Sequence, residues 1–135
     1  MSSSLSLFRA GARYEHGMVV TPGVMDDFMA LSGDQNPMHR DAGFAKAHGF
    51  KGAIVYGNLF GAMVSTLVGM KLPSKEVVIA RQTLEFRSPA YVGDEIKLEA
   101  TIANVAEAVK SVQFKLQFTA NAEVLCTGQL LIRCL

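Results

Sequence analysis

The stretch from residue 52 to residue 70 contains nineteen consecutive residues without a formal charge. From about Gly57 onward, its apolar residues recur with helical spacing on more than one side, which is typical of a helix surrounded by other structure. Pro73 follows closely, and a proline cannot continue a helix. We therefore expect one buried helix from about Gly57 to Met70, and the rest of the chain must cover it.

The second half of the chain changes from this helical period to an alternation of apolar and polar residues, which is typical of β-strands. The alternating runs lie at residues 83–87, 95–102 and 112–118, and a last run at 124–135 is apolar on both sides. Turn-forming residues separate these runs at 92–94, 106–107 and 120–121. Long antiparallel strands with one apolar face need an apolar partner, and the uncharged helix is the only candidate. We predict an α+β fold in which a curved antiparallel sheet wraps around that helix.

The residues before the uncharged stretch predict one more strand and one more helix. Met18 to Val20 is a short apolar run that we expect to be a strand. Thr21 and Pro22 suit the N-cap and the first position of a helix, and Gly33 suits its end. The apolar face of this helix is expected to hold Val24, Phe28 and Leu31.

The size and charge of the chain indicate one globular domain. With 135 residues, of which half are hydrophobic and 19% are charged, the chain can bury a core as a single domain over residues 1–135. Thirteen basic and twelve acidic residues give a net charge of +1, and no basic run is present. We therefore expect no nucleic acid among its partners.

Three further features bear on the location of the protein. Residues 1–13 have no basic start before their short apolar patch, so we expect no signal peptide. The stretch 52–70 approaches the length of a membrane span, but it includes polar residues and four glycines, so we expect no membrane span. Cys126 and Cys134 lie eight residues apart in one predicted strand, too far from each other for a disulfide. We expect two reduced thiols in a cytoplasmic protein without a metal site.

The segment 32–39, which reads Ser-Gly-Asp-Gln-Asn-Pro-Met-His, carries two proton-transfer groups. Pro37 lacks an amide donor and favours extended geometry at Asn36, so we expect no regular helix in this segment. A stiff loop of this kind can direct the carboxylate of Asp34 and the imidazole of His39 toward one point. Asp34 alone is more often a turn or capping residue, but the pair favours catalysis when it is read with the buried helix.

The start of the predicted helix at Gly57 adds a third group. A helix N-terminus offers unpaired amide donors and partial positive charge, and glycine lets a carbonyl oxygen approach the backbone. Acid, base and oxyanion donor together suit the addition or removal of water beside a thioester carbonyl. On the same helix, Phe60, Met63 and Leu67 either line an acyl pocket or pack in the core, and core packing is the commoner explanation for such residues.

Three blocks of sequence carry a resemblance to a known family. They are Asp34-Gln-Asn-Pro-Met-His39, Ile54-Val-Tyr-Gly57 and Phe86-Arg-Ser-Pro-Ala-Tyr-Val-Gly-Asp-Glu95. With them, the chain resembles the MaoC-like hot-dog-fold hydratases, and most closely the short (R)-specific enoyl-CoA hydratases that supply hydroxyacyl units for polyhydroxyalkanoate synthesis. The resemblance covers nearly the whole chain. It implies a hot-dog fold, in which a five-stranded curved sheet wraps around one long central helix.

The resemblance also implies roles for individual residues. The family's loop aspartate and histidine, which match Asp34 and His39, hold the catalytic water, and a backbone amide matching Gly57 polarises the thioester carbonyl. Asn36 is implied as a loop-shaping residue. The predicted substrate contacts are Asn36 and Tyr56, together with Phe60, Met63 and Leu67 of the central helix. The implied assembly is a homodimer joined edge to edge, and no cofactor is implied, because coenzyme A or carrier-protein pantetheine enters as part of the substrate.

Two positions depart from the family pattern. The family usually has histidine where this chain has Tyr56, which is expected to alter the oxyanion environment. It also often has a serine where this chain has Ala62, so a hydroxyl that helps to orient the loop is missing.

The sequence thus predicts a hydro-lyase that adds water reversibly to trans-2-enoyl-CoA to give (R)-3-hydroxyacyl-CoA. One alternative is a dehydratase that acts on a 3-hydroxyacyl chain carried by an acyl carrier protein, which would then be a partner. Another is a hot-dog thioesterase or a non-catalytic acyl-thioester binder. Thioesterases of this fold use a carboxylate on the central helix, and no Asp or Glu lies between Gly57 and Met70.

Overall fold

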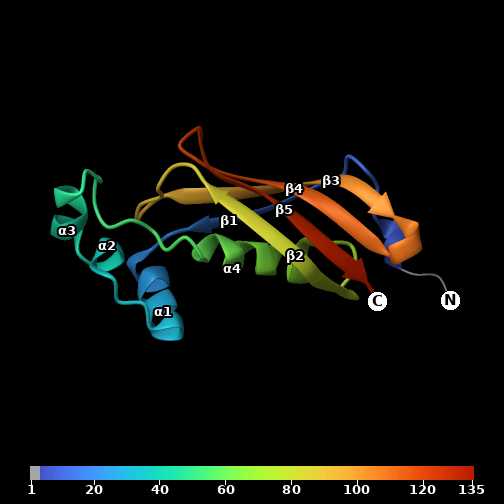
Figure 1. Cartoon of the computed structure of the whole chain (residues 1–135), viewed down its shortest axis with the longest axis horizontal. Helices are drawn as coiled ribbons and strands as arrows, with labels where there is room; N and C mark the ends of the chain where they lie inside the picture. The colour runs from blue at the N-terminus through green and yellow to red at the C-terminus, as the bar shows by residue number, and fades with distance from the viewer. Residues whose placement is uncertain (1–3) are drawn as a thin grey trace.

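The computed structural model describes residues 4–135 and shows a five-stranded antiparallel sheet lying against one central helix (Figure 1). The strands are β1 (Arg13–Val19), β2 (Val77–Phe86), β3 (Glu95–Ala106), β4 (Ser111–Ala120) and β5 (Glu123–Cys134). Their order across the sheet is β1-β3-β4-β5-β2. The helices are α1 (Pro22–Ser32), α2 (Pro37–Arg40), α3 (Ala42–Ala47) and α4 (Leu59–Thr66), with a π-helical turn η2 (Leu67–Lys71) and 3₁₀ turns η1 (Ser4–Leu7) and η3 (Glu107–Val109). The prediction about a signal peptide concerns residues 1–13, so it falls in part outside the described residues.

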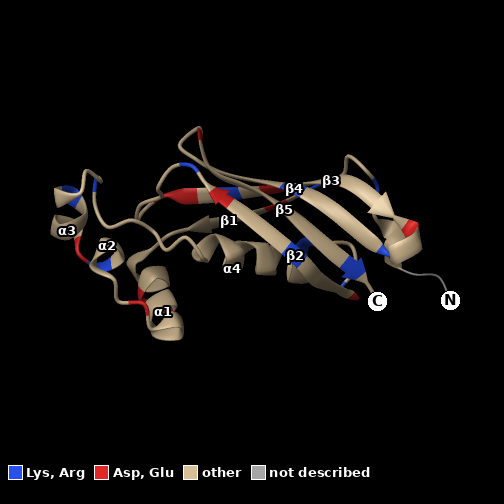
Figure 2. Cartoon of the chain, viewed as in Figure 1, with Lys and Arg blue, Asp and Glu red and all other residues tan. Residues whose placement is uncertain are grey.

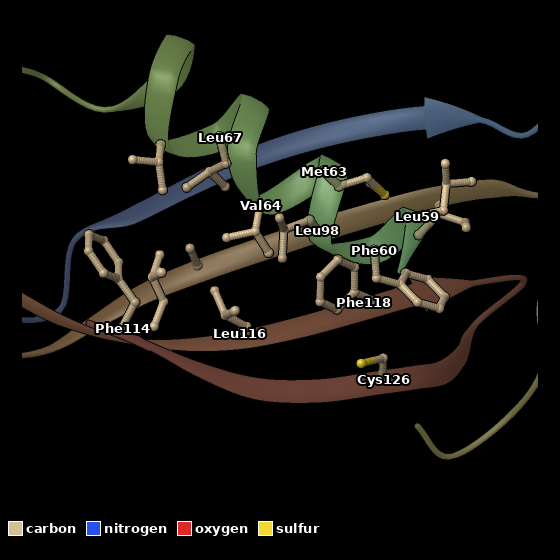
Figure 3. Packing of buried hydrophobic residues seen from close by; sticks show 14 of the residues in the cluster. Leu59, Phe60, Met63, Val64, Leu67, Leu98, Phe114, Leu116, Phe118 and Cys126 are labelled. Carbon is tan, nitrogen blue, oxygen red and sulfur yellow. The ribbon is translucent and has the colours of Figure 1, made fainter. Parts of the chain in front are cut away.

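The hydrophobic core lies between α4 and the inner face of the sheet. Figure 3 shows side chains of α4 and η2 pointing toward side chains of β3, β4 and β5. The rings of Phe60 on α4 and Phe118 on β4 meet edge to face, with centroids 4.9 Å apart. Burying one such large side chain contributes roughly 1.5–3 kcal/mol. The prediction of a buried helix covered by an antiparallel sheet is confirmed.

The buried stretch is less uniform than its sequence predicts. The α-helix begins at Leu59 and passes into a π-helical turn at Leu67, so only part of the expected range is α-helical. The prediction that helical spacing would bury the whole stretch is wrong at Met70, whose exposed fraction is 68%. This residue lies on η2, the last turn of the stretch.

The alternating runs of the second half form β2 to β5 as predicted, but the first strand is longer than expected. The sequence predicts a strand over Met18–Val20, whereas β1 covers Arg13–Val19 and pairs antiparallel with β3. In this edge strand the inward positions are only half-buried, and one of them is His16. An alternation with so few strongly apolar residues gives a weak strand signal.

Helix α1 begins and ends where the sequence predicts. The Thr21 side chain accepts a hydrogen bond from the Val24 amide, and Gly33 closes the helix with a φ of 76°. The predicted apolar face is right for Val24 and Phe28, which are partly buried against the core, and wrong for Leu31, which is 86% exposed, while Met25 is the buried residue of the helix. Helices α1, α2 and α3 gather at one end of the molecule (Figure 1), and α1 reaches the core through Met25, which is buried.

Basic and acidic residues are interspersed along the strands, and α4 carries neither (Figure 2). No helix among residues 4–135 has the length and hydropathy needed to cross a membrane. Both cysteines, Cys126 and Cys134, are free and buried.

Candidate active site

The segment between α1 and α2 is shaped by a chain of side-chain to backbone hydrogen bonds. Ser32 Oγ accepts from the Asp34 amide at 3.1 Å, and Asp34 Oδ1 accepts from the Asn36 amide at 3.0 Å. Asn36 Oδ1 in turn accepts from the Met38 amide at 2.9 Å, which makes Asn36 the N-cap of α2. Such Asx turns fix the backbone locally and thereby the direction of the Asp34 carboxylate.

The expectation that this segment contains no regular helix is wrong for Pro37–Arg40, which forms the single turn α2. Pro37 occupies the first helical position, where no amide donor is needed and its fixed φ suits the helix. His39 therefore projects from a helical turn rather than from an extended loop.

The imidazole of His39 is oriented by a backbone carbonyl. Its Nδ1 lies 2.8 Å from the carbonyl oxygen of Ile54. A carbonyl oxygen only accepts, so in the neutral ring Nδ1 carries the proton and Nε2 keeps its lone pair. Ile54 is itself held, because its amide donates to the Met38 carbonyl at 3.0 Å. The chain thus presents His39 with Nε2 as a proton acceptor.

One pocket of about 210 Å³ brings the three predicted catalytic groups together. Its lining residues are Phe28, Asp34, His39, Tyr56, Gly57, Asn58 and Phe86. Gly57 lies immediately before α4, and its amide donates no hydrogen bond to another group within residues 4–135. Asp34, His39 and Gly57, the last of them just before a helix N-terminus, therefore line one small cavity.

The remaining predicted substrate contacts lie in two different places. Tyr56 is 1% exposed and lines the pocket with its ring against His39, whereas Asn36 shapes the loop beside it. Phe60, Met63 and Leu67 are packed in the hydrophobic core and do not line the pocket.

Three pocket residues were not singled out as site residues by the sequence, namely Phe28 on α1, Asn58 just before α4 and Phe86 at the end of β2. Phe86 opens the third block of the family resemblance, and Phe28 lies on the predicted apolar face of α1. Each phenylalanine therefore had a weak signal, but neither pattern distinguishes a pocket wall from ordinary packing.

A wider hollow of about 790 Å³ crosses the face of the sheet that points away from α4. Its charged lining mixes both signs, with Arg13, Glu85, Arg87, Glu99 and Lys115. It contains no histidine or cysteine, so it offers no counterpart to the pairing of Asp34 with His39. Volume alone does not identify a site, and the smaller pocket is the one with convergent reactive groups.

No group of three His, Cys, Asp or Glu side chains within residues 4–135 is arranged to hold a metal ion.

Comparison with known proteins gives consistent matches over nearly the whole chain. The MaoC like domain family matches residues 8–123. An (R)-specific enoyl-CoA hydratase of Aeromonas caviae is 33% identical over 108 residues, covering 78% of this chain and 80% of the relative. A mitochondrial 3-hydroxyacyl-[acyl-carrier-protein] dehydratase of Solanum lycopersicum is 30% identical over 125 residues, covering 93% of this chain and 71% of the relative.

Solved structures show the same architecture. The (R)-hydratase of A. caviae involved in PHA biosynthesis superposes with a TM-score of 0.88 at 28% identity, covering 93% of this chain and 96% of that one. The R-hydratase PhaJ1 of Pseudomonas aeruginosa gives a TM-score of 0.87 at 28% identity, covering 95% and 83%. These matches confirm the predicted hot-dog fold, and the chain belongs to the MaoC-like family.

Proposed function

We propose that the protein is a hydro-lyase that adds water reversibly to a trans-2-enoyl-CoA and forms an (R)-3-hydroxyacyl-CoA. The observation that carries this proposal is the single pocket lined by Asp34, His39 and Gly57. The hydratase and dehydratase names of the relatives support the same reaction.

Hydration requires attack of water on the third carbon of the acyl chain and delivery of a proton to the second carbon. Nε2 of His39, with its free lone pair, suits removal of the proton from water as the carbon–oxygen bond forms. Oδ1 of Asp34 already accepts from the Asn36 amide, so its other carboxylate oxygen remains to orient the water. General acid–base catalysis of this kind contributes about 10²–10⁴ in rate. The proton taken from water is returned to the second carbon, which completes the addition.

Negative charge develops on the thioester oxygen during this step. Gly57 lines the pocket just before α4, which supports its backbone amide as the donor that receives that charge. One such oxyanion donor is typically worth about 3–4 kcal/mol. Dehydration passes through the same transition state in reverse, so these groups serve both directions.

The second candidate substrate is a 3-hydroxyacyl chain on an acyl carrier protein, since the tomato relative carries that name. A thioesterase is disfavoured because α4 and η2 contain no Asp or Glu that could activate hydrolytic water.

We further propose a cytoplasmic homodimer joined along β2. Among the described residues 4–135 this edge strand pairs only with β5, and eight of its ten residues are exposed. Val78, Ile79 and Phe86 are 47%, 42% and 56% exposed, which is unusual for apolar residues on an unprotected edge. Phe86 also lines the pocket, so a partner at this edge would lie beside the site.

Both cysteines are free and buried, which fits the reducing compartment that a cytoplasmic location implies.

One assay separates the possible reactions. The protein is mixed with crotonyl-CoA, and the absorbance of the conjugated enoyl thioester is followed while a thiol reagent reports free coenzyme A. The proposal predicts loss of absorbance without release of thiol, and the product should be the (R)-3-hydroxy isomer. Release of thiol would mean hydrolysis. If neither signal appears, the assay is repeated with a crotonyl acyl carrier protein, and inactivity there too would overturn the proposed function.

A further inference from the structure

The segment 33–36, which carries Asp34, is tied to distant parts of the chain by one hydrogen bond. The hydroxyl of Tyr56 donates to the backbone carbonyl of Asp34 at 2.6 Å. Within residues 4–135, every other hydrogen bond of this segment joins residues no more than four positions apart. The local bonds give the loop its shape, and within residues 4–135 the Tyr56 hydroxyl makes the one hydrogen bond that ties residues 33–36 themselves to the stretch before α4.

The ring of Tyr56 holds the second reactive group. It stacks on the imidazole of His39 with centroids 4.3 Å apart and an interplanar angle of 26°. On another side it meets the ring of Phe28, with centroids 4.6 Å apart. His39 is therefore held at one edge by the Ile54 carbonyl and on one face by Tyr56. Tyr56 itself is 1% exposed, so its ring has little freedom to move.

From these contacts we propose that Tyr56 is a positioning residue. Its hydroxyl fixes the position of Asp34, and its ring fixes the orientation of His39. This inference rests on the proposed function. An aromatic body with a polar tip is suited to hold two groups at once, because the body stacks while the tip accepts or donates a hydrogen bond. A displacement of about 1 Å in a catalytic group can cost on the order of 10²-fold in rate, so an otherwise locally anchored loop needs this link.

Three variants separate the hydroxyl from the ring. Tyr56→Phe removes the hydroxyl, with its hydrogen bond to Asp34 and its interaction with Arg40, whereas Tyr56→Leu also removes the stacking on His39. Tyr14→Phe is the matched control, because Tyr14 lies on β1 outside the pocket and meets Phe114 edge to face at 6.3 Å. We expect Tyr56→Phe to lower kcat by about tenfold, the rate equivalent of one hydrogen bond, with KM changed less than about twofold. Tyr56→Leu should lower kcat by about 10²-fold, and Tyr14→Phe should match the wild type.

A double-mutant cycle distinguishes positioning from a general loss of structure. If the hydroxyl acts through Asp34, Tyr56→Phe should change the residual rate by less than about twofold in the Asp34→Asn background, because the two residues work as one unit. A destabilised fold would lower the rate equally in both backgrounds. Equal losses in the two backgrounds, or wild-type kcat in Tyr56→Phe, would overturn the inference.

A readout without substrate keeps this test separate from the proposed function. The Gln35 amide belongs to the same peptide group as the Asp34 carbonyl, so its nitrogen-15 resonance should shift in Tyr56→Phe. The ring nitrogens of His39 should keep their wild-type chemical shifts in Tyr56→Phe, and these shifts should change in Tyr56→Leu. The ring nitrogens of His48 should keep their wild-type chemical shifts in both variants. If these shifts occur but the wild type turns over no thioester, the proposed function fails and the positioning role stands. If the Gln35 and His39 resonances do not respond, the positioning role fails whatever the activity.

Discussion

The ring of Phe86 lies against the backbone of Gly57. A Cβ atom added at Gly57 would stand 3.3 Å from two carbons of that ring, which is closer than ordinary van der Waals contact. Gly57 provides the proposed oxyanion donor and Phe86 forms a wall of the same pocket. The absence of a side chain at position 57 therefore keeps the amide open to a carbonyl oxygen.

Gly57→Ala is expected to lower kcat/KM for crotonyl-CoA by about tenfold or more, because the new methyl group obstructs the approach to the amide donor. The fold should survive, since the added methyl group would meet only the far end of the Phe86 side chain and no backbone atom. Gly69→Ala is the matched control, because a Cβ there meets nothing within 4 Å. Wild-type kcat/KM in Gly57→Ala would contradict the assignment of this amide.

Gly128→Ala is expected to destabilise the sheet without touching the pocket. Gly128 on β5 lies opposite Leu84 of β2, and an added Cβ would collide with the backbone oxygen of Thr83. Overpacking of this kind costs about 1–3 kcal/mol. Urea unfolding should show this loss in the free energy of unfolding, with little change in Gly69→Ala. An unchanged unfolding midpoint in Gly128→Ala would contradict the close approach of β2 and β5.

His16 is expected to make the stability of the protein depend on pH. Burial lowers the pKa of His16 below its ordinary value of 6.5, and Lys71 lowers this pKa further. Below pH 6.5 the unfolded chain binds a proton that the folded chain does not, so the unfolded state gains stability. The free energy of unfolding should therefore fall as the pH drops from about 6.5 to the lower pKa of the folded state.

The comparison is between wild type and His16→Gln in urea at pH 7.5 and pH 5.5. His16 lies in a cleft with Glu15, Lys71, Glu95 and Lys97, and all of these remain in the variant. The loss of stability between the two pH values should be smaller in His16→Gln. An equal loss in both proteins would mean that His16 does not contribute.

Cys126 is expected to be unreactive in the folded protein. Burial raises the pKa of its thiol to about 11, and the residue has no exposed surface. The thiolate is the reactive form, so iodoacetamide at pH 8 should label Cys126 only after unfolding. Peptide mass spectrometry before and after urea treatment provides the measurement. Rapid labelling of the native protein would show that β5 is more open than the structure indicates.

The sequence predicts most of the fold because there are few arrangements in which long strands with one apolar face and an uncharged helix can bury each other's apolar surface. The strands β2 to β5 follow the alternation of the second half. The beginning of β1 is missed because an edge strand needs fewer apolar residues, and Leu31 is misplaced because helical spacing does not say which part of a face meets the core.

The site is predictable only in part. Asp34, His39 and Gly57 follow from their residue types and from the family resemblance, and one pocket contains all three. The role of Tyr56 does not follow, because its contacts with Asp34 and His39 join residues distant in the sequence and depend on how α1, α2 and α4 pack. Phe28 and Phe86 become pocket walls through the same packing.

The most direct test of the account is the rate of crotonyl-CoA hydration by Asp34→Asn and His39→Ala. In Asp34→Asn the side-chain amide oxygen can still accept from the Asn36 backbone amide, so the loop should keep its shape while it loses the negative charge. Both variants should fold, as judged by circular dichroism, and should hydrate about 10²–10⁴ times more slowly than the wild type. Turnover close to that of the wild type in either folded variant would contradict catalysis by this pair.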